Sequence, residues 1–330
     1  MTAAAGRAAD VPRKIIIDTD PGVGIPGTDA DDPIAILLAL ADPRLELLAV
    51  TTTFGNCPPA LSARGAAAVL AAAGRADIPV AKGRDTPLSG RLDPILVEAY
   101  AGARGREGRL PLPDPGTTTP LGAAELIART VREHPGEVTV VTIGPQTNLA
   151  EALIADPELA GLIDSVVFMG GGLGLEPTYG GGNVTPYAEC NIYFDAAAAD
   201  VVLRSGVDIS MVGLDVTNPA TGLILEPELI RSVEPSSPAQ RLFLDVCATY
   251  LEAPMFEWGH GCVLYDPLAV LATAGPVGRW EDRRLRVETG PGEHHGQTQE
   301  GRADDPLVHV LVEVDGRAAV DRIVSTILTL

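Results

Sequence analysis

The chain has few basic and few aromatic residues. Its 330 residues include 24 Lys and Arg against 44 Asp and Glu, which gives a formal charge of -20, and aromatic residues make up only 4%. Proteins that bind a nucleic-acid backbone present clustered Lys and Arg. The charge therefore argues against a nucleic-acid partner.

Cysteines and long apolar runs are also scarce. Cys57, Cys190, Cys247 and Cys262 lie far apart and form no C-x-x-C pair, so neither a zinc site nor a redox motif is indicated and we expect buried free thiols. The first 14 residues lack the apolar core of a signal peptide, and no later stretch reaches about 18 uninterrupted apolar residues. We expect a cytoplasmic protein without a membrane span.

Short apolar runs alternate with Ala- and Leu-rich segments. The predicted strands are 14–17, 45–53, 138–143, 165–169 and 207–214, and the predicted helices are 33–41, 59–73, 121–133, 147–155 and 195–205. This alternation predicts an α/β fold with a single open, mostly parallel sheet, a Rossmann-like core and helices on both faces. The tail, with apolar runs at 285–288 and 307–314 and a helix from about 316, completes the same unit.

No low-complexity linker divides the chain, and 46% of its residues are hydrophobic, which supplies a large core. We therefore predict a flexible N-terminus at 1–12 and a single domain at 13–330. Three loop-like stretches stand out at 86–118, 170–187 and 253–265. Ligands of open α/β sheets bind beyond the carboxyl ends of the strands, and each of these loops could reach that edge.

An acidic stretch follows the first predicted strand. Within "KIIIDTDPGVGIPGTDADDPIAILLAL", fifteen residues contain Asp18, Asp20, Asp29, Asp31 and Asp32. Like charges this close raise one another's pKa or require a cation to neutralise them. Several carboxylate oxygens suit Ca²⁺ or Mg²⁺, and an arrangement that includes backbone carbonyls favours Ca²⁺. The stretch therefore predicts a metal site, although its spacing is not that of an EF-hand.

One of these residues has a simpler explanation. Asp32 precedes Pro33, and Asp before a Pro at the first helical position is typical of a helix N-cap. Capping alone would explain Asp32. It does not explain Asp20 and Asp31 as well.

Further motifs follow the acidic stretch in a fixed order. They are "TTTFGN", "IGPQTNLAEAL", "MGGG", "GNVTPYAECN" and "YDPLAV", the last an Asp-Pro pair that opens a helix, with "VETG" and "GQTQ" continuing the series more weakly. Together with "DTDPG" and its following Asp pair, this set resembles the inosine-uridine-preferring nucleoside hydrolases. The resemblance implies cleavage of the N-glycosidic bond of a ribonucleoside, giving free base and ribose, with a tightly held Ca²⁺.

The resemblance also implies the metal ligands. Asp20, Asp32, Asp266 and the backbone carbonyl of Ile143 would bind Ca²⁺, and a water and the 2′- and 3′-hydroxyls of ribose would complete its sphere. Asp20 would be the general base that completes deprotonation of the water. Asp18, just before these ligands, would orient them from behind.

The substrate contacts follow in the same way. By similarity, Asp31 binds the 2′-hydroxyl, and the remaining ribose contacts are Asn183, Glu189 and Asn191, with Asn56 and Met169 completing the pocket. Turn formation beside glycine is the alternative for Asn183. Glu189 and Asn191, spaced by two, would share a face if the chain were extended there.

The base side of the pocket departs from the family pattern. Tyr265 stands where relatives have a His that protonates the leaving base, and a phenol with a pKa near 10 is a weaker acid. Arg104 and Arg106 occupy the loop where histidines are expected, unless both are simply solvated. Trp258 and His260 are candidate contacts to the base, although a Trp beside Met and Phe is often a packing residue.

A second departure is an insertion. Relatives place the Asp pair one residue after "DPG", whereas "VGIPGTDA" at 23–30 intervenes here. A segment rich in Gly and Pro can loop out without moving its ends, and Asp29 would then belong to the loop and not to the metal. If the loop does not fold out, Asp31 and Asp32 are displaced.

Two other functions remain open at this stage. The D-x-D strand end also resembles haloacid-dehalogenase phosphatases, but these need a Lys near the site, and the chain has only Lys14 and Lys82. A catalytically impaired homologue that binds nucleoside or ribose without turnover is the second alternative. The family resemblance favours a homodimer or homotetramer.

Overall fold

The computed structural model describes residues 11–103, 118–175, 180–252 and 261–330. Its centre is a nine-stranded sheet with the order β10-β9-β11-β6-β5-β4-β1-β2-β3. The strands are β1 (Arg13–Thr19), β2 (Leu45–Thr52), β3 (Val80–Lys82), β4 (Val138–Thr142), β5 (Ser165–Met169), β6 (Ile209–Val212), β9 (Gly278–Val287), β10 (Thr298–Glu300) and β11 (Leu307–Val314). All neighbours from β3 to β11 pair in parallel, and only β9 runs antiparallel to its two neighbours. A mostly parallel sheet is what the strand–helix alternation predicts.

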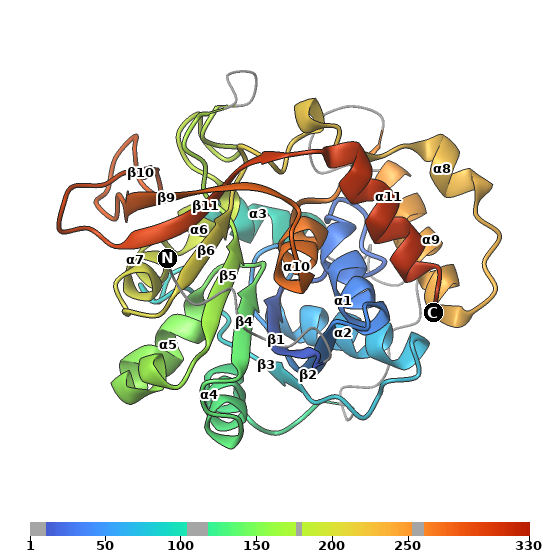
Figure 1. Ribbon diagram of the computed structural model, residues 1–330, viewed down its shortest axis with the longest axis horizontal. Helices are drawn as coiled ribbons and strands as arrows, with labels where there is room; N and C mark the ends of the chain where they lie inside the picture. The colour runs from blue at the N-terminus through green and yellow to red at the C-terminus, as the bar shows by residue number, and fades with distance from the viewer. Residues whose placement is uncertain (1–10, 104–117, 176–179, 253–260) are drawn as a thin grey trace.

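Helices cover both faces of the sheet (Figure 1). They are α1 (Asp31–Ala41), α2 (Pro59–Ala72), α3 (Pro94–Ala103), α4 (Ala123–Glu133), α5 (Thr147–Ala155), α6 (Cys190–Phe194), α7 (Ala196–Leu203), α8 (Pro227–Ser232), α9 (Pro238–Glu252), α10 (Tyr265–Ala274) and α11 (Gly316–Ile327), with 3₁₀ turns at Pro157–Gly161 and Pro219–Thr221. A small second sheet pairs β7 (Ile224–Leu225) with β8 (Cys262–Val263). Helices α1, α2, α9, α10 and α11 lie on one side of the main sheet, and α4, α5 and α7 lie on the other.

The alternation of side chains along β1 shows why both faces need cover. Ile15 and Ile17 belong to the core beneath α1 and α10, whereas Ile16 points into the core beneath α4 and α5. All three side chains are fully buried. A strand that is apolar on both faces must be sandwiched between two helical layers, as the isoleucine run predicts.

The predicted loops are only partly correct. The stretch at 86–118 contains α3, and the stretch at 253–265 contains β8 and the first residue of α10, so neither is wholly irregular. Pro94 opens α3, and Pro, Gly and Arg on either side of this short helix hide its apolar residues in the sequence. The predicted loop at 170–187 has no helix or strand among its described residues.

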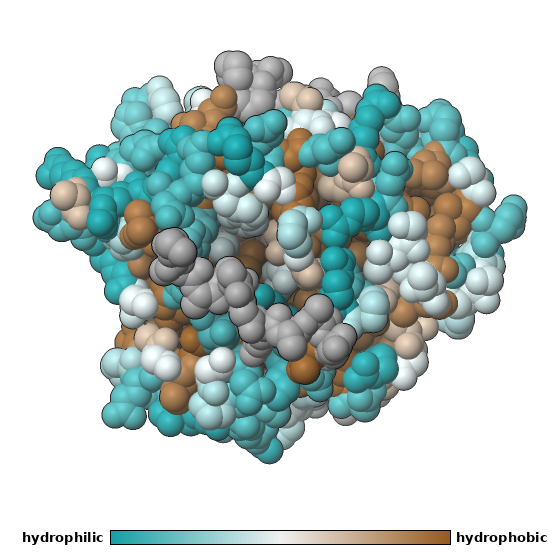
Figure 2. Space-filling view, in the orientation of Figure 1, coloured by the Kyte–Doolittle hydropathy of each residue, from teal (hydrophilic) through white to brown (hydrophobic). Residues whose placement is uncertain are grey.

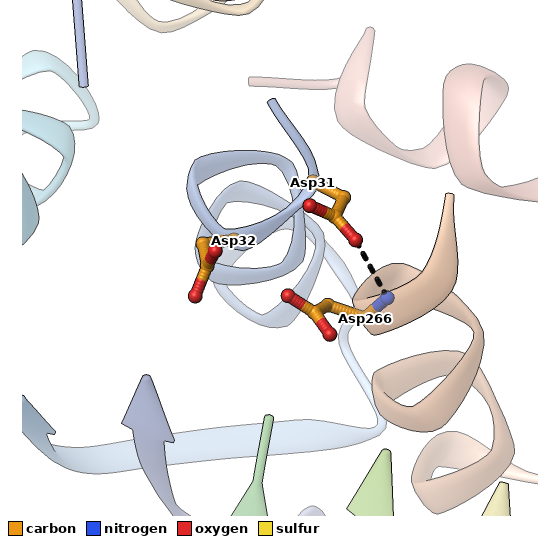
Figure 3. A group of neighbouring side chains, drawn as sticks. All are labelled: Asp31, Asp32 and Asp266. Carbon is orange, nitrogen blue, oxygen red and sulfur yellow. Dashed lines mark hydrogen bonds between the residues drawn. The ribbon is translucent and has the colours of Figure 1, made fainter. Parts of the chain in front are cut away.

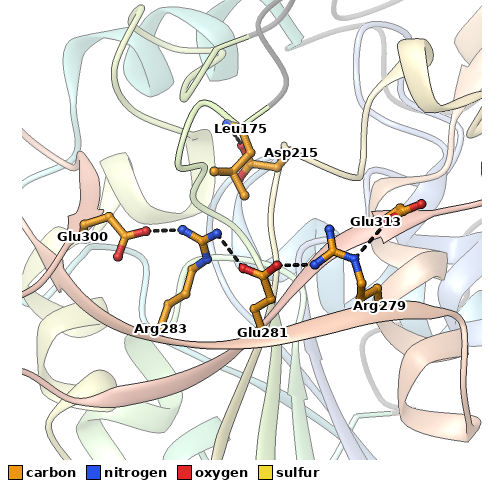
Figure 4. Close-up of polar contacts among 7 residues, drawn as sticks. All are labelled: Leu175, Asp215, Arg279, Glu281, Arg283, Glu300 and Glu313. Atoms are coloured by element: carbon orange, nitrogen blue, oxygen red, sulfur yellow. Dashed lines mark hydrogen bonds and ion pairs between the residues drawn. The ribbon is translucent and has the colours of Figure 1, made fainter.

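The edge of the sheet at β9 and β10 is strongly polar. Arg279 contacts Glu281 and Glu313, and Arg283 contacts Glu281 and Glu300, which forms one ion-pair chain across the strands (Figure 4). Figure 2 shows mainly hydrophilic residues over this region. Exposed ion pairs add little stability, but charges on an edge discourage pairing with another sheet.

Among the described residues, no helix has the length and apolar character needed to cross a bilayer.

The burial pattern predicts a contrast between two isoleucines. Ile36 in α1 is 0% exposed and Ile154 in α5 is 56% exposed. We expect Ile36→Ala to lower the free energy of unfolding by about 2–5 kcal/mol, because it removes buried methyl groups and leaves a cavity. Ile154→Ala should change it by less than about 0.5 kcal/mol. Denaturant unfolding measures both, and equal effects would contradict the packing described above.

Candidate active site

Two helix N-termini bring three carboxylates together beyond the carboxyl ends of the strands. Asp31 and Asp32 lie in the first turn of α1, and Asp266 lies in the first turn of α10. One oxygen from each of the three lies within 4.8 Å of the others, and the backbone N–H of Asp266 donates to Asp31 Oδ2 at 3.1 Å (Figure 3). Residues 235 positions apart therefore share one site, and the group could hold a metal ion.

Asp20 joins this group from the end of β1. Its backbone N–H donates to Asp32 Oδ1 at 2.9 Å, and its own carboxylate accepts the N–H of Asn56 at 2.6 Å. Two glycines leave room for that carboxylate. A Cβ at Gly55 would lie 1.8 Å from Asp20 Oδ2, and a Cβ at Gly144 would lie 2.8 Å from Oδ1. The sequence motifs contain both glycines, but their part in placing Asp20 is visible only in the structure.

Asp32 is not a helix cap, so that alternative is wrong. Helix α1 begins one residue earlier, and its N-cap residue, Ala30, makes no side-chain capping bond. The Asp32 carboxylate instead accepts hydrogen bonds from the Thr19 hydroxyl and, at 2.9 Å, from Asn56 Nδ2, in addition to the Asp20 N–H. These donors fix Asp32 beside Asp20.

Asp18 lies behind the group and does not line the cavity described below. It is fully buried, and its Oδ1 accepts hydrogen bonds from Thr51 Oγ1 and Asn148 Nδ2, both at 2.7 Å. Burial raises the pKa of Asp18 to about 7 in spite of these two donors. The supporting role of Asp18 stays a prediction, and Asn148, from the Thr-Asn motif, is a partner of Asp18 that the sequence did not indicate.

Burial and mutual repulsion dominate the electrostatics. Burial raises the pKa values of Asp20, Asp31 and Asp266 well above 3.8, and the charges of neighbouring aspartates raise them further. None of the ion pairs formed by described residues involves these carboxylates. A buried group of oxygen donors without a cationic side chain is the chemistry that fits a hard divalent cation.

The site opens into a cavity of about 510 Å³. Three of the four predicted metal ligands, Asp20, Asp266 and Ile143, line it. The four predicted ribose contacts, Asp31, Asn183, Glu189 and Asn191, also line it, as do Asn56 and Met169, which were predicted to complete the pocket. Its size suits a small ligand.

Glu189 and Asn191 reach the cavity by a different geometry from the predicted one. The chain is not extended there, because Glu189 is the N-cap of α6 and Asn191 lies within that helix. Glu189 accepts the N–H groups of Asn191 at 2.8 Å and Ile192 at 3.1 Å, and also that of Gly171 at 2.8 Å. Burial raises its pKa to about 7. The residue that was predicted to bind ribose therefore also anchors the glycine turn.

Two amides organise the rest of this wall. Asn191 Nδ2 donates to the carbonyl of Ile143 at 3.1 Å and to the carbonyl of Met169 at 3.2 Å. A carbonyl has two lone pairs, so Ile143 can accept this bond and still offer an oxygen to a metal. Asn183 Oδ1 accepts the N–H of Cys190 at 2.9 Å, which links the predicted turn to α6.

The base side is described in part. Tyr265 is the first residue of α10, is buried and lines the cavity. Trp258 and His260, and likewise Arg104 and Arg106, lie outside the described residues.

Of the four free cysteines, Cys190 is partly exposed and the other three are buried, so the prediction of buried thiols is wrong for Cys190 alone.

The inserted segment does not loop out into solvent. Val23 and Ile25 are 3% and 2% exposed, and Pro26, Gly27, Thr28 and Asp29 line the cavity. Asp31 and Asp32 nevertheless lie beside Asp266, so the inserted segment has not displaced them from the group. Asp29 lies outside the three-carboxylate group, yet burial and the charge of Asp32 raise its pKa to about 7.

Comparison with known proteins places this site in a family. The model of the inosine-uridine preferring nucleoside hydrolases matches residues 15–321. A pyrimidine-specific ribonucleoside hydrolase, RihA, from Escherichia coli O1:K1 is 37% identical over 320 residues, 93% of this chain and 96% of that protein. Uridine nucleosidase 1 from Arabidopsis thaliana is 37% identical over 279 residues, 84% of this chain and 78% of that one.

Solved structures agree. A plant nucleoside hydrolase, the PpNRh1 enzyme, superposes with a TM-score of 0.81 at 28% identity, covering 97% of this chain and all of that one. A purine-preferring ribonucleoside hydrolase from Gardnerella vaginalis gives 0.79 at 29% identity, covering 96% and 98%. The chain belongs to the inosine-uridine preferring nucleoside hydrolase family. It is a glycosidase that hydrolyses ribonucleosides to base and ribose.

The raised pKa values predict how stability changes with pH. The pKa values of Asp18 and Asp29 are about 7 in the folded protein against 3.8 for an ordinary Asp. Between these two values the folded protein holds more protons than the unfolded chain, so raising the pH favours unfolding. Without divalent cations, the melting temperature should therefore fall by at least about 5 °C between about pH 5 and pH 8. Millimolar Ca²⁺ should remove most of this fall by binding the folded state. Thermal melts with and without a chelator test it, and a Ca²⁺-independent pH profile would contradict it.

The glycines beside Asp20 generate a second prediction. Gly55→Ala should lower kcat/KM about 100-fold, because the new methyl group collides with the Asp20 carboxylate and misplaces it. Gly122→Ala is the matched control, since a Cβ there meets no atom within 4 Å. Kinetics and circular dichroism of both variants should be compared. Equal activity in the two variants would show that Asp20 does not need this position.

Proposed function

We propose that Ca²⁺ is the metal of this ribonucleoside hydrolase and that Asp20 is its general base. The observation that carries the proposal is the position of Asp20, which lines the cavity and is hydrogen-bonded to Asp32 beside Asp31 and Asp266. One carboxylate is thereby close to both a metal-binding group and the space for a substrate.

The residues that would hold Ca²⁺ are Asp20, Asp32, Asp266 and the carbonyl of Ile143. Their chemistry fits, because they offer only oxygen atoms and because buried carboxylates with raised pKa values lack a cationic partner among the described side chains. When bound, Ca²⁺ would supply positive charge that makes a neighbouring water more acidic and holds ribose hydroxyls in place. Asp18 would keep this group in position through β1.

The ribose would be held between the two sides of the cavity. Asp31 would accept the 2′-hydroxyl, and Glu189, Asn183 and Asn191 would bind hydroxyls from the opposite wall. Their support comes from the lining of the cavity and from the backbone donors that lock Glu189. Asn56 and Met169 would complete the pocket. Fixed donors and acceptors suit a sugar because its hydroxyls make directional hydrogen bonds.

In the reaction, Asp20 takes a proton from the attacking water. The water oxygen bonds to C1′ as the C1′–N bond breaks, and the electron pair of that bond leaves with the base, which takes up a proton. The sugar passes through a state with oxocarbenium character, and the carboxylates around it stabilise the positive charge. Tyr265 is the described candidate for a hydrogen bond to the leaving base.

Among neutral nucleosides we propose pyrimidine ribonucleosides as substrates. The support is the names of two relatives at 37% identity, one pyrimidine-specific and one a uridine nucleosidase. Base contacts from Trp258 and His260, a homodimer or homotetramer, and a cytoplasmic location remain predictions.

The phosphatase alternative is excluded by the family, and Asp18, its required nucleophile, is buried away from the cavity.

The test is a reducing-sugar assay with uridine, cytidine, inosine, adenosine and guanosine, in Ca²⁺ and in a chelator. Asp20→Asn should lower kcat at least about 100-fold, because the amide cannot accept the proton. Asp77→Asn, on the exposed surface beside Arg75, is the matched control and should behave as wild type. Bound Ca²⁺ without ribose release from any nucleoside would favour the binding-only alternative.

A further inference from the structure

The inserted segment at 23–30 builds one wall of the active-site cavity. Its turn is closed by the Thr28 hydroxyl, which contacts the carbonyls of Gly22 at 2.6 Å and Ile25 at 2.8 Å. Val23 and Ile25 anchor the segment in the core. The residues that follow, from Pro26 to Asp29, therefore have a fixed position along the cavity.

Asp29 is the acidic residue of this wall, and its backbone is hydrogen-bonded to the site. Its N–H donates to Asn56 Oδ1 at 3.3 Å, and Asn56 in turn binds the carboxylates of Asp20 and Asp32. The side chain is partly buried and lines the same cavity as Asp20, Asp31 and Asp266. The insertion therefore adds one carboxylate to those that the metal and the ribose require.

The remaining described wall offers no compensating charge. Among the described lining residues none is Lys, Arg or His, and the apolar part of the lining includes Leu96, Val184 and Phe194, which belong to one hydrophobic cluster. A neutral base leaves with an extra electron pair and must gain a proton, and a nearby carboxylate disfavours the anion that forms. A base that is already cationic is attracted by Asp29 and leaves as a neutral molecule.

Resting on the proposed function, we propose that this cavity takes ribosides of a cationic six-membered base, of the pyridinium class, and that Asp29 is the residue that selects for the positive charge. In the reaction the water oxygen bonds to C1′, and the electron pair of the C1′–N bond returns to the ring nitrogen. A neutral pyridine leaves without a proton. The proton of the water passes to Asp20 and then to solvent.

The test compares nicotinamide riboside, whose base is cationic, with uridine, whose base is neutral. In wild-type protein with Ca²⁺, kcat/KM for nicotinamide riboside should exceed that for uridine. Asp29→Asn keeps the shape of the side chain and removes its charge, so the ratio of the two kcat/KM values should fall at least about tenfold. Most of the change should be in KM for the cation, because Asp29 acts on binding.

Asp85→Asn is the matched control. Asp85 is exposed, paired with Lys82 and not among the residues that line the cavity, and its replacement should leave the ratio unchanged. Circular dichroism and a thermal melt show whether each variant is folded, and a reaction without enzyme gives the spontaneous loss of nicotinamide.

The outcomes separate this inference from the function on which it rests. A wild-type enzyme that hydrolyses uridine but not nicotinamide riboside overturns the inference and leaves the proposed function intact. An Asp29→Asn variant that loses both substrates equally also overturns it, because Asp29 would then serve the metal group. Hydrolysis of neither substrate by the wild-type protein overturns the proposed function itself.

Discussion

The repulsion among buried carboxylates is the constraint on which this structure depends. Asp20, Asp31, Asp32 and Asp266 are each at most 4% exposed, and neighbouring charges raise the pKa values of three of them beyond the effect of burial. The N-termini of α1 and α10 soften the repulsion, since their free N–H groups and dipoles favour negative charge. A helix end carries only about half a unit charge, however, which is small against four carboxylates. A divalent cation is the remaining way to keep the group charged.

The parallel sheet explains how such a group can be assembled at all. Asp20 follows β1, Ile143 follows β4, and Met169 ends β5, and these three strands are neighbours in the sheet. Their carboxyl ends therefore lie side by side, whatever the distance between them in the sequence. Helix α10 adds Asp266 because it packs against α1 on the same face. The site is thus a consequence of strand order.

The sequence could predict what repeats along the chain and what a family motif carries. Alternating apolar segments indicated the sheet, and the motifs identified the residues that gather around Asp266. The sequence could not predict the backbone conformation within these short motifs. Glu189 and Asn191 look like strand neighbours by spacing, yet the N–H groups of Asn191 and Ile192 that Glu189 accepts make it a helix cap. Likewise "VGIPGTDA" has the composition of an exposed loop, and only the packing of Val23 and Ile25 shows that it forms a wall.

The insertion and Tyr265 belong to one change in the charge balance of the cavity. Tyr265 cannot carry a positive charge as a His could, and Asp29 can carry a negative one, so both residues move the potential of the cavity in the same direction. Such a shift disfavours a leaving base that must pass through an anion, while the ribosyl cation is stabilised as before. Asn56 binds the carboxylates of Asp20 and Asp32 and also accepts the backbone N–H of Asp29. A single asparagine therefore connects the carboxylate group to the 23–30 segment.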